Sequence, residues 1–217
     1  MQDTRELARL MQEKAELVSA KVSTVAKIED AFNYAADLCA TKDACQLLFA
    51  GCASPLSSPA EELCETKAPE RIIAAPGLDP ELFEQFAAVC EKQGISLLSH
   101  GLRQKLAGID IGFTIADYGV AATGSLVQSS NDEELRLATM ISEFHVAVLP
   151  ISKIRATSFD VEEALRGWAK DAPAYTSFIT GASRTADIER VLAIGVHGPL
   201  ELHILLLEDA PCKTHEI

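Results

Sequence analysis

Three short polar stretches in the second half of the chain carry the residues best suited to chemistry. They run from Asp117 to Ser125, from Gly181 to Glu189 and from Gly195 to Pro199, and each interrupts an otherwise apolar segment. Glycine lets the backbone approach a ligand closely, while Ser, Thr, Arg and His supply directed hydrogen bonds and charge. We therefore expect a binding site in these three turns.

The first turn lies between two strand-like segments, and ligands of open α/β sheets bind beyond the ends of strands. Backbone N–H groups near Gly119 and Gly124, with the hydroxyls of Thr123 and Ser125, suit a carboxylate or a phosphate. The alternative is that the glycines only permit a tight connection that Asp117 caps. The segment alone leaves both interpretations open.

The second turn combines Ser183, Arg184 and Thr185 after Gly181. A strand followed by a glycine turn and a helix start forms an anion site, to which Arg184 adds a forked set of donors. Asp187 and Glu189 fall in the same first helical turn, where they repel an anion, so Arg184 pairing with a carboxylate of the chain is the alternative. The chain has neither a Walker A nor a G-x-G-x-x-G motif, which argues against a nucleotide-binding fold of the usual kind.

Two histidines complete the set of candidates. His197, next to Gly198 in the third turn, suits a general base or a carboxylate-binding group, because imidazole titrates near neutral pH. His145 begins an apolar strand. For both residues the alternative is a solvent-exposed ring or an ordinary local hydrogen bond, and neither belongs to a paired-histidine motif that indicates a metal.

Alternating helices and strands position these turns. Helices are predicted from Thr4 to about Lys27, from Glu29 to Phe49, from Ser58, from Asp79 to Gly94, from about Asp132, from a cap at Asp160, and through Val191 and Leu192. Strands are predicted at Arg71–Ala75, Ile95–Leu98, Ile109–Ala116, Gly124–Gln128, His145–Pro150, Thr176–Thr180 and Leu202–Leu207. The class is therefore α/β, a three-layer Rossmann-like arrangement with a largely parallel sheet covered on both faces.

Length and charge limit the function. A chain of 217 residues fits one α/β domain, assigned to residues 31–210, after an N-terminal amphipathic helix in residues 1–30 and before a polar tail at 211–217. The net charge of −13 repels nucleic acid and anionic membranes. No signal peptide or membrane span is recognisable, and we expect a cytoplasmic protein.

The N-terminal helix carries an apolar stripe through Leu7, Leu10 and Met11. Such a stripe packs either against its own domain or against a partner helix. A homodimer formed through this helix is therefore a hypothesis.

The six cysteines contain no C-x-x-C pair, and their spacing matches no known cluster pattern. Buried free cysteine behaves as a small apolar residue. We therefore expect neither a metal nor a cofactor bound by this chain.

Taken together and in this order, the turns resemble the LUD domain family, in particular its lactate utilization protein C members. The resemblance rests on Thr114–Val127, Arg136 with His145, Thr180–Glu189, and Gly195–Pro199 before an apolar strand. It covers the C-terminal half with specific motifs and the N-terminal half in layout only.

The resemblance implies a fold like that of the ribose-phosphate isomerase, glucosamine-phosphate deaminase (NagB) and coenzyme A transferase group. It also implies a cytoplasmic protein acting with iron–sulfur partner proteins in the oxidation of L-lactate to pyruvate, with the clusters on the partners. Two positions depart from the family pattern: Ala122 stands where an acidic residue is usual, and Ala182 where proline is usual. The missing carboxylate weakens a covalent mechanism.

Three functions follow from these observations. The first is an accessory or ligand-binding subunit of a lactate-oxidising system, holding a small carboxylate or phosphate. The second is a free-standing enzyme of the isomerase or transferase kind, with Asp117, Asp187 or His197 as acid and base. The third is a scaffold. The residues expected to bind the ligand are Thr123, Gly124, Ser125, Arg136, His145, Ser183, Arg184, Thr185, Glu189, His197 and Gly198.

Overall fold

A computed structural model describes residues 4–43, 49–50, 54–55, 57–67, 70–105, 108–170, 174–185, 193–194 and 198–208. Its α-helices are α1 (Thr4–Leu17), α2 (Ile28–Thr41), α3 (Ser58–Lys67), α4 (Pro80–Lys92), α5 (Glu133–Ile141) and α6 (Glu162–Trp168), with short 3₁₀ helices η2 (Leu102–Gln104), η3 (Ile151–Lys153) and η4 (Ser158–Val161). None of these helices is both long and apolar enough to cross a membrane.

The main sheet has six strands in the order β1-β14-β9-β6-β4-β5. These are β1 (Ala20–Val25), β14 (Glu201–Leu207), β9 (Ser142–Pro150), β6 (Ile109–Ile115), β4 (Arg71–Ala74) and β5 (Ile95–Leu98). Every neighbouring pair is parallel. All six strands therefore begin at one edge of the sheet, the amino edge, and end at the other, the carboxyl edge.

A second sheet of four strands, not predicted from the sequence, has the order β10-β7-β8-β11. Its strands are β10 (Ile154–Arg155), β7 (Tyr118–Val120), β8 (Ser125–Ser129) and β11 (Thr176–Ile179). The first predicted turn is thus the end of the antiparallel β7–β8 hairpin. Two-residue pairs, β2 (Phe49–Ala50) with β3 (Ser54–Pro55) and β12 (Arg184–Thr185) with β13 (Ala193–Ile194), complete the fold.

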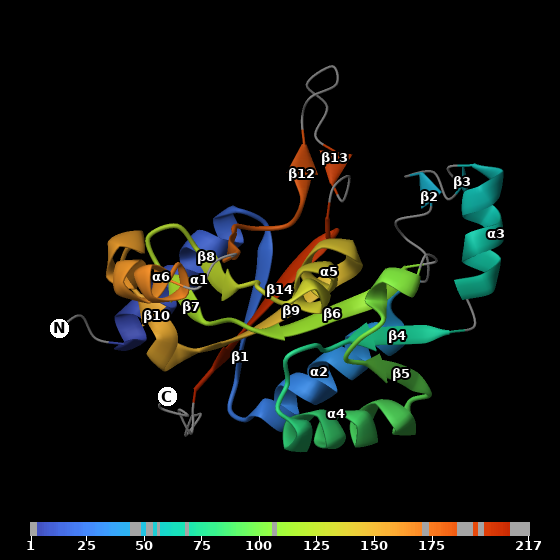
Figure 1. The fold of residues 1–217 in the computed structure, drawn as a ribbon, viewed down its shortest axis with the longest axis horizontal. Helices are drawn as coiled ribbons and strands as arrows, with labels where there is room; N and C mark the ends of the chain where they lie inside the picture. The colour runs from blue at the N-terminus through green and yellow to red at the C-terminus, as the bar shows by residue number, and fades with distance from the viewer. Residues whose placement is uncertain are drawn as a thin grey trace.

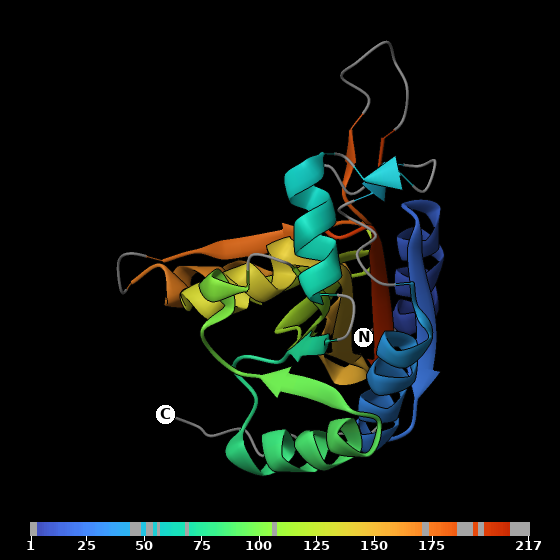
Figure 2. The same cartoon turned by 90° about the vertical axis from the view of Figure 1, so that its right-hand side faces the viewer.

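Helices cover both faces of the main sheet, which confirms the α/β class. Figures 1 and 2 show α2 and α4 together on one side and α5 on the opposite side. On the α2–α4 side, Phe32 stacks on Phe86 with ring centroids 4.6 Å apart, and both rings contact Phe113. Helix α1 packs on the other face, where Met11 and Ala15 are completely buried. Its apolar stripe is therefore used within its own domain, and the pairing of two copies stays a prediction.

The predicted N-terminal helix is too long. It ends at Leu17, and Ser19, with a left-handed φ of 68°, turns the chain into β1, the edge strand beside β14. The apolar residues of β1 continue the helical spacing of α1, which explains the error. Val22, Thr24 and Val25 are β-branched and fit a pleated strand better than a helix.

Two other predicted helix limits are wrong. Helix α2 ends at Thr41, well before Phe49. Asp160 is not the cap of a helix; its carboxylate accepts from the backbone N–H of Thr157, which is the capping residue of η4. Arg184 and Thr185 form β12, which pairs antiparallel with β13, and the helix predicted through Val191 and Leu192 has no described residues. Residues 186–192 and the tail at 211–217 lie outside the described residues.

Candidate functional site

The three predicted turns meet beside the α1–β1 connection. The hydroxyl oxygens of Ser125 in the first turn and of Thr180, the residue directly before the second turn, are 2.7 Å apart. The backbone N–H of Ser183 in the second turn donates to the carbonyl of Pro199 in the third, at 3.0 Å. The fold therefore brings the described parts of the three segments together.

Two glycines permit this convergence. Gly124 and Gly181 both have left-handed φ angles, 65° and 72°. A Cβ at Gly124 would lie 2.3 Å from the backbone nitrogen of Ala15, and one at Gly181 would lie 2.1 Å from the carbonyl oxygen of Val18. Both glycines are therefore required for close packing against the end of α1, and their presence does not by itself indicate a ligand.

Replacing Gly181 with alanine is expected to lower the free energy of unfolding more than replacing Gly94 with alanine. Gly94 has a similar φ of 68°, but nothing lies within 4 Å of its added Cβ. Both variants lose the ease with which glycine adopts a left-handed φ. Only the new Cβ of Gly181→Ala also collides with backbone atoms, which adds about 1–3 kcal/mol to the loss of stability. Urea unfolding of the two variants measures the difference, and equal losses would contradict the close approach.

A cluster of hydroxyl groups forms where the turns meet. Thr123 Oγ1 lies 2.8 Å from Ser125 Oγ, which in turn contacts Thr180, and we call these three residues the hydroxyl cluster. In the second turn, exposed Arg184 donates through Nη1 to Ser19 Oγ, in the α1–β1 connection, at 3.4 Å. Hydroxyls both donate and accept, and a guanidinium carries five N–H donors. Groups of these kinds are the donors that bind small anions in proteins.

Asp117 is used inside the second sheet. Its Oδ2 accepts from the backbone N–H of Ser129 at 2.7 Å and from Gln128 Nε2 at 3.1 Å, at the end of the hairpin opposite Gly124. Burial raises the pKa of Asp117, against the opposing effects of the Ser129 bond and the charge of Lys153. These bonds hold the two strands of the β7–β8 hairpin together at its open end, which is a structural role for Asp117.

The structure does not bring Arg136 to the hydroxyl cluster. Arg136 donates to the carbonyl oxygens of Ser130 and Asn131 at 2.5 and 2.9 Å, and its guanidinium lies 4.7 Å from the ring centre of Tyr175. These contacts tie the start of α5 to the segment before β11.

His145 is a buried group of the main sheet. Its Nε2 lies 2.9 Å from Thr114 Oγ1. Burial, and to a smaller extent the charge of His203, lowers the pKa of His145 to about 4. The ring is therefore neutral at neutral pH and supplies no charge for an anion.

The remaining candidates fall in the second and third turns. Gly198 packs closely on Ser183, since a Cβ there would lie 3.3 Å from Ser183 Cβ. Thr185 belongs to β12 by its backbone. Asp187, Glu189 and His197 lie outside the described residues.

A buried network of five charged side chains at the amino edge was missed from the sequence. Lys42 and Lys67 both bind Asp110, with Lys42 Nζ 3.0 Å from Oδ1, and Lys42 also binds Glu143. Arg71 Nη1 approaches Asp110 Oδ1 at 3.4 Å. We call these residues the ion network. The available signal was an acidic side chain inside each of two apolar strands, because charged groups are buried only when paired.

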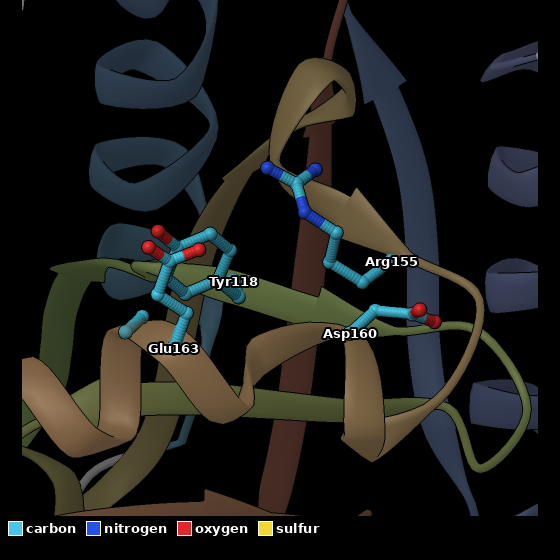
Figure 3. A pocket seen from close by; sticks show the side chains of 5 residues that line it. Tyr118, Arg155, Asp160 and Glu163 are labelled. Atoms are coloured by element: carbon cyan, nitrogen blue, oxygen red, sulfur yellow. The ribbon is translucent and has the colours of Figure 1, made fainter.

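A shallow pocket of about 330 Å³ lies near the carboxyl edge, where ligands of open parallel sheets usually bind. It is lined by Tyr118, Arg155, Asp160, Glu163 and Ala164. Arg155 donates to two carbonyls of its own segment, and Asp160 accepts from its own cap. Figure 3 shows the carboxylate of Asp160 pointing away from Tyr118 and Glu163. The lining charges therefore do not converge on one ligand position.

The cysteines that the structure describes do not resemble metal ligands. Cys39 and Cys90 are buried, and burial raises the pKa of each thiol to about 12. Cys64 is half-buried. No group of three or more His, Cys, Asp or Glu residues suited to a metal occurs in the described ranges. Cys45, Cys52 and Cys212 lie outside those ranges.

The LUD domain family matches residues 8–207, nearly the whole chain. The chain belongs to the LUD domain family. Membership confirms the resemblance drawn from the three turns. It also extends that resemblance to the N-terminal half, where the sequence showed only a similar layout.

Curated relatives of this LUD protein match part of it. A protein named lactate utilization protein C from Halalkalibacterium halodurans is 31% identical over 140 residues, covering 60% of each chain. A protein of the same name from an Exiguobacterium species is 33% identical over 103 residues, covering 46% of this chain and 45% of that one. The chain thus spans 60% or less of the length of these two relatives.

A solved structure shares the fold of this LUD protein. The crystal structure of a DUF162 family protein from Deinococcus radiodurans superimposes with a TM-score of 0.59 over 96% of this chain and 100% of that chain. At 15% identity this likeness concerns the fold alone.

Proposed function

We propose that this LUD protein is an accessory, ligand-binding subunit of a system that oxidises L-lactate to pyruvate in the cytoplasm. The names of its curated relatives support the pathway. The observation that carries the binding role is the convergence of the three turns, which sets Arg184 and the hydroxyl cluster beside the α1–β1 connection.

The chemistry of these groups suits a 2-hydroxy acid. The guanidinium of Arg184 matches a carboxylate in charge and geometry, and the hydroxyls of Thr123 and Ser125 can exchange hydrogen bonds with a neighbouring hydroxyl or carbonyl. A chain of net charge −13 repels anions over most of its surface, so a local arginine decides where one binds.

The redox step of this system is assigned to partner proteins. The cysteine spacing of the chain matches no iron–sulfur pattern, and the thiols of Cys39 and Cys90 lie buried and protonated. We propose that iron–sulfur partner subunits carry the clusters while this subunit binds the small acid. Free thiols such as these are typical of a reducing cytoplasm.

Replacing Arg184 with alanine is expected to abolish stabilisation by a bound carboxylate. Wild-type protein in excess sodium L-lactate or pyruvate should unfold at a higher temperature than in equal sodium chloride, because a ligand that binds only the folded state stabilises it. The Arg184→Ala variant should show no such rise, while its midpoint without ligand should stay near that of wild type. Differential scanning fluorimetry measures both.

Arg166→Ala is the matched control, since Arg166 is an exposed arginine that pairs with Glu162 on its own helix. Its response to lactate and pyruvate should equal that of wild type. A wild-type response retained in Arg184→Ala would contradict the proposed site. Wild-type protein unaffected by lactate, pyruvate and phosphate alike would instead support a scaffold.

A further inference from the structure

A second set of polar groups forms a chain on the α2 side of the main sheet. The hydroxyl of Tyr34 lies 2.7 Å from His203 Nδ1, and the opposite ring nitrogen, Nε2, lies 2.7 Å from Glu201 Oε2. The same carboxylate oxygen is 2.6 Å from Lys21 Nζ. His203 is 2% exposed, whereas Lys21 and Glu201 reach solvent. These contacts therefore connect Tyr34 of α2 to the surface through the buried imidazole of His203.

The charges fix the position of each proton. Bonds from Lys21 and His203 hold the pKa of Glu201 below its usual value despite burial, so the carboxylate is ionised and only accepts. Burial lowers the pKa of His203, so its ring is neutral and carries one proton. That proton must be on Nε2, facing Glu201. Nδ1 is then a bare acceptor, and the hydroxyl of Tyr34 donates to it.

A carboxylate, an imidazole and a hydroxyl in this order are the arrangement that activates a hydroxyl nucleophile. We propose that Tyr34 is an acyl-accepting group, with His203 as its base and Glu201 as the residue that positions the base. Its substrates are activated acyl compounds, such as esters or thioesters of small acids. This site is separate from the one at Arg184 and does not depend on it.

The acyl transfer balances within these groups. The oxygen of Tyr34 bonds to the acyl carbon while the bond to the leaving group breaks, and the Tyr34 proton moves to His203 Nδ1. The imidazolium formed there is stabilised by Glu201, and it returns the proton to the leaving group. Burial raises the pKa of Tyr34, so the hydroxyl stays protonated at neutral pH and needs this base.

Two neighbouring residues support the proposed role of the Tyr34–His203–Glu201 chain. The charge of Lys21 acts on Tyr34 as well as on Glu201, and a cation near a reacting oxygen stabilises negative charge that develops there. The ring of Phe144 stacks on His203 with centroids 5.8 Å apart, which holds the imidazole in place.

Acetylation by N-acetylimidazole tests the proposal. Mass spectrometry of peptides gives the rate at Tyr34 relative to that at Tyr175, which is 53% exposed and serves as a reference inside the same chain. We expect His203→Gln to lower this ratio tenfold or more and Glu201→Gln to lower it severalfold. His100→Gln, which replaces an exposed histidine outside the chain of contacts, should leave it unchanged. An unchanged ratio in His203→Gln, or a Tyr34 that is not acetylated in wild type, would overturn the proposal.

A measurement on wild-type protein covers the case in which His203→Gln does not fold. Nitrogen-15 NMR of the histidine rings should show His203 protonated on Nε2 and bare on Nδ1. A proton on Nδ1 would overturn the assignment, because Tyr34 would then accept from His203 and have no base. Tyr34→Phe, which removes only the hydroxyl, identifies the acetylated peptide.

Discussion

Replacing Asp110 with asparagine is expected to lower the free energy of unfolding by about 3–5 kcal/mol, the usual cost of removing one partner from a buried ion pair. Asp110 is completely buried and contacts Lys42, Lys67 and Arg71, two of which are themselves almost fully buried. The neutral amide can still accept from the backbone N–H of Ile72, which now bonds to Oδ2 at 2.8 Å. It cannot balance the buried lysine charges.

Urea unfolding followed by circular dichroism measures this effect. Glu162→Gln is the control, because Glu162 pairs with Arg166 on the surface, with side chains 55% and 77% exposed. Exposed pairs contribute little, so its midpoint should stay where it is in wild type. A loss below about 1 kcal/mol for Asp110→Asn would mean that the ion network is screened like a surface pair.

Acidification from pH 6.5 to 4 is expected to remove about 3 kcal/mol of stability through His145 alone. Its pKa is about 4 in the folded protein against 6.5 for a free histidine, a gap that corresponds to about 3 kcal/mol. Between these pH values the unfolded chain binds a proton that the folded protein rejects. The stabilisation is therefore complete above pH 6.5 and is lost as the pH falls to 4.

Free energies of unfolding for wild type and His145→Gln, measured in urea across this range, isolate the effect. The free energy of unfolding of His145→Gln should fall less steeply with decreasing pH than that of wild type, whatever the stability of the variant at pH 7. The pKa of His203, also lowered by burial, adds to the wild-type slope, and the raised pKa of Asp117 opposes it. Both groups remain in His145→Gln, so the difference between the two curves belongs to His145. Parallel curves would show that its proton does not affect folding.

The sequence predicted the architecture because alternation and apolarity are local signals. Continuous apolar runs such as Leu202–Leu207 predicted buried parallel strands, and the structure confirms them. Strand β1 was missed because its valines follow the helical spacing of α1, and only pairing with β14 decides its conformation. The second sheet was missed because β7 and β10 are three and two residues long.

The sequence indicated which residues belong to the candidate site, but not which parts of the chain those residues contact. The three turns do meet, yet what Gly124 and Gly181 contact is the end of α1, which no pattern within the turns reveals. The ion network and the Tyr34–His203–Glu201 chain join residues that are far apart in sequence, such as Tyr34 and His203. Reading one segment at a time identifies the charged residue inside each apolar strand but not its partner.

The position of β14 determines when the protein can fold during synthesis. This strand lies between β1 and β9, and among the described strands it is the only neighbour of β1 in the main sheet. A nascent chain therefore holds β1 without a pairing partner until the residues near 207 have left the ribosome. Among the neighbouring strands of the main sheet, β1 and β14 are the pair farthest apart in sequence, so closing this contact has the largest loop entropy and we expect the pairing to form late in folding.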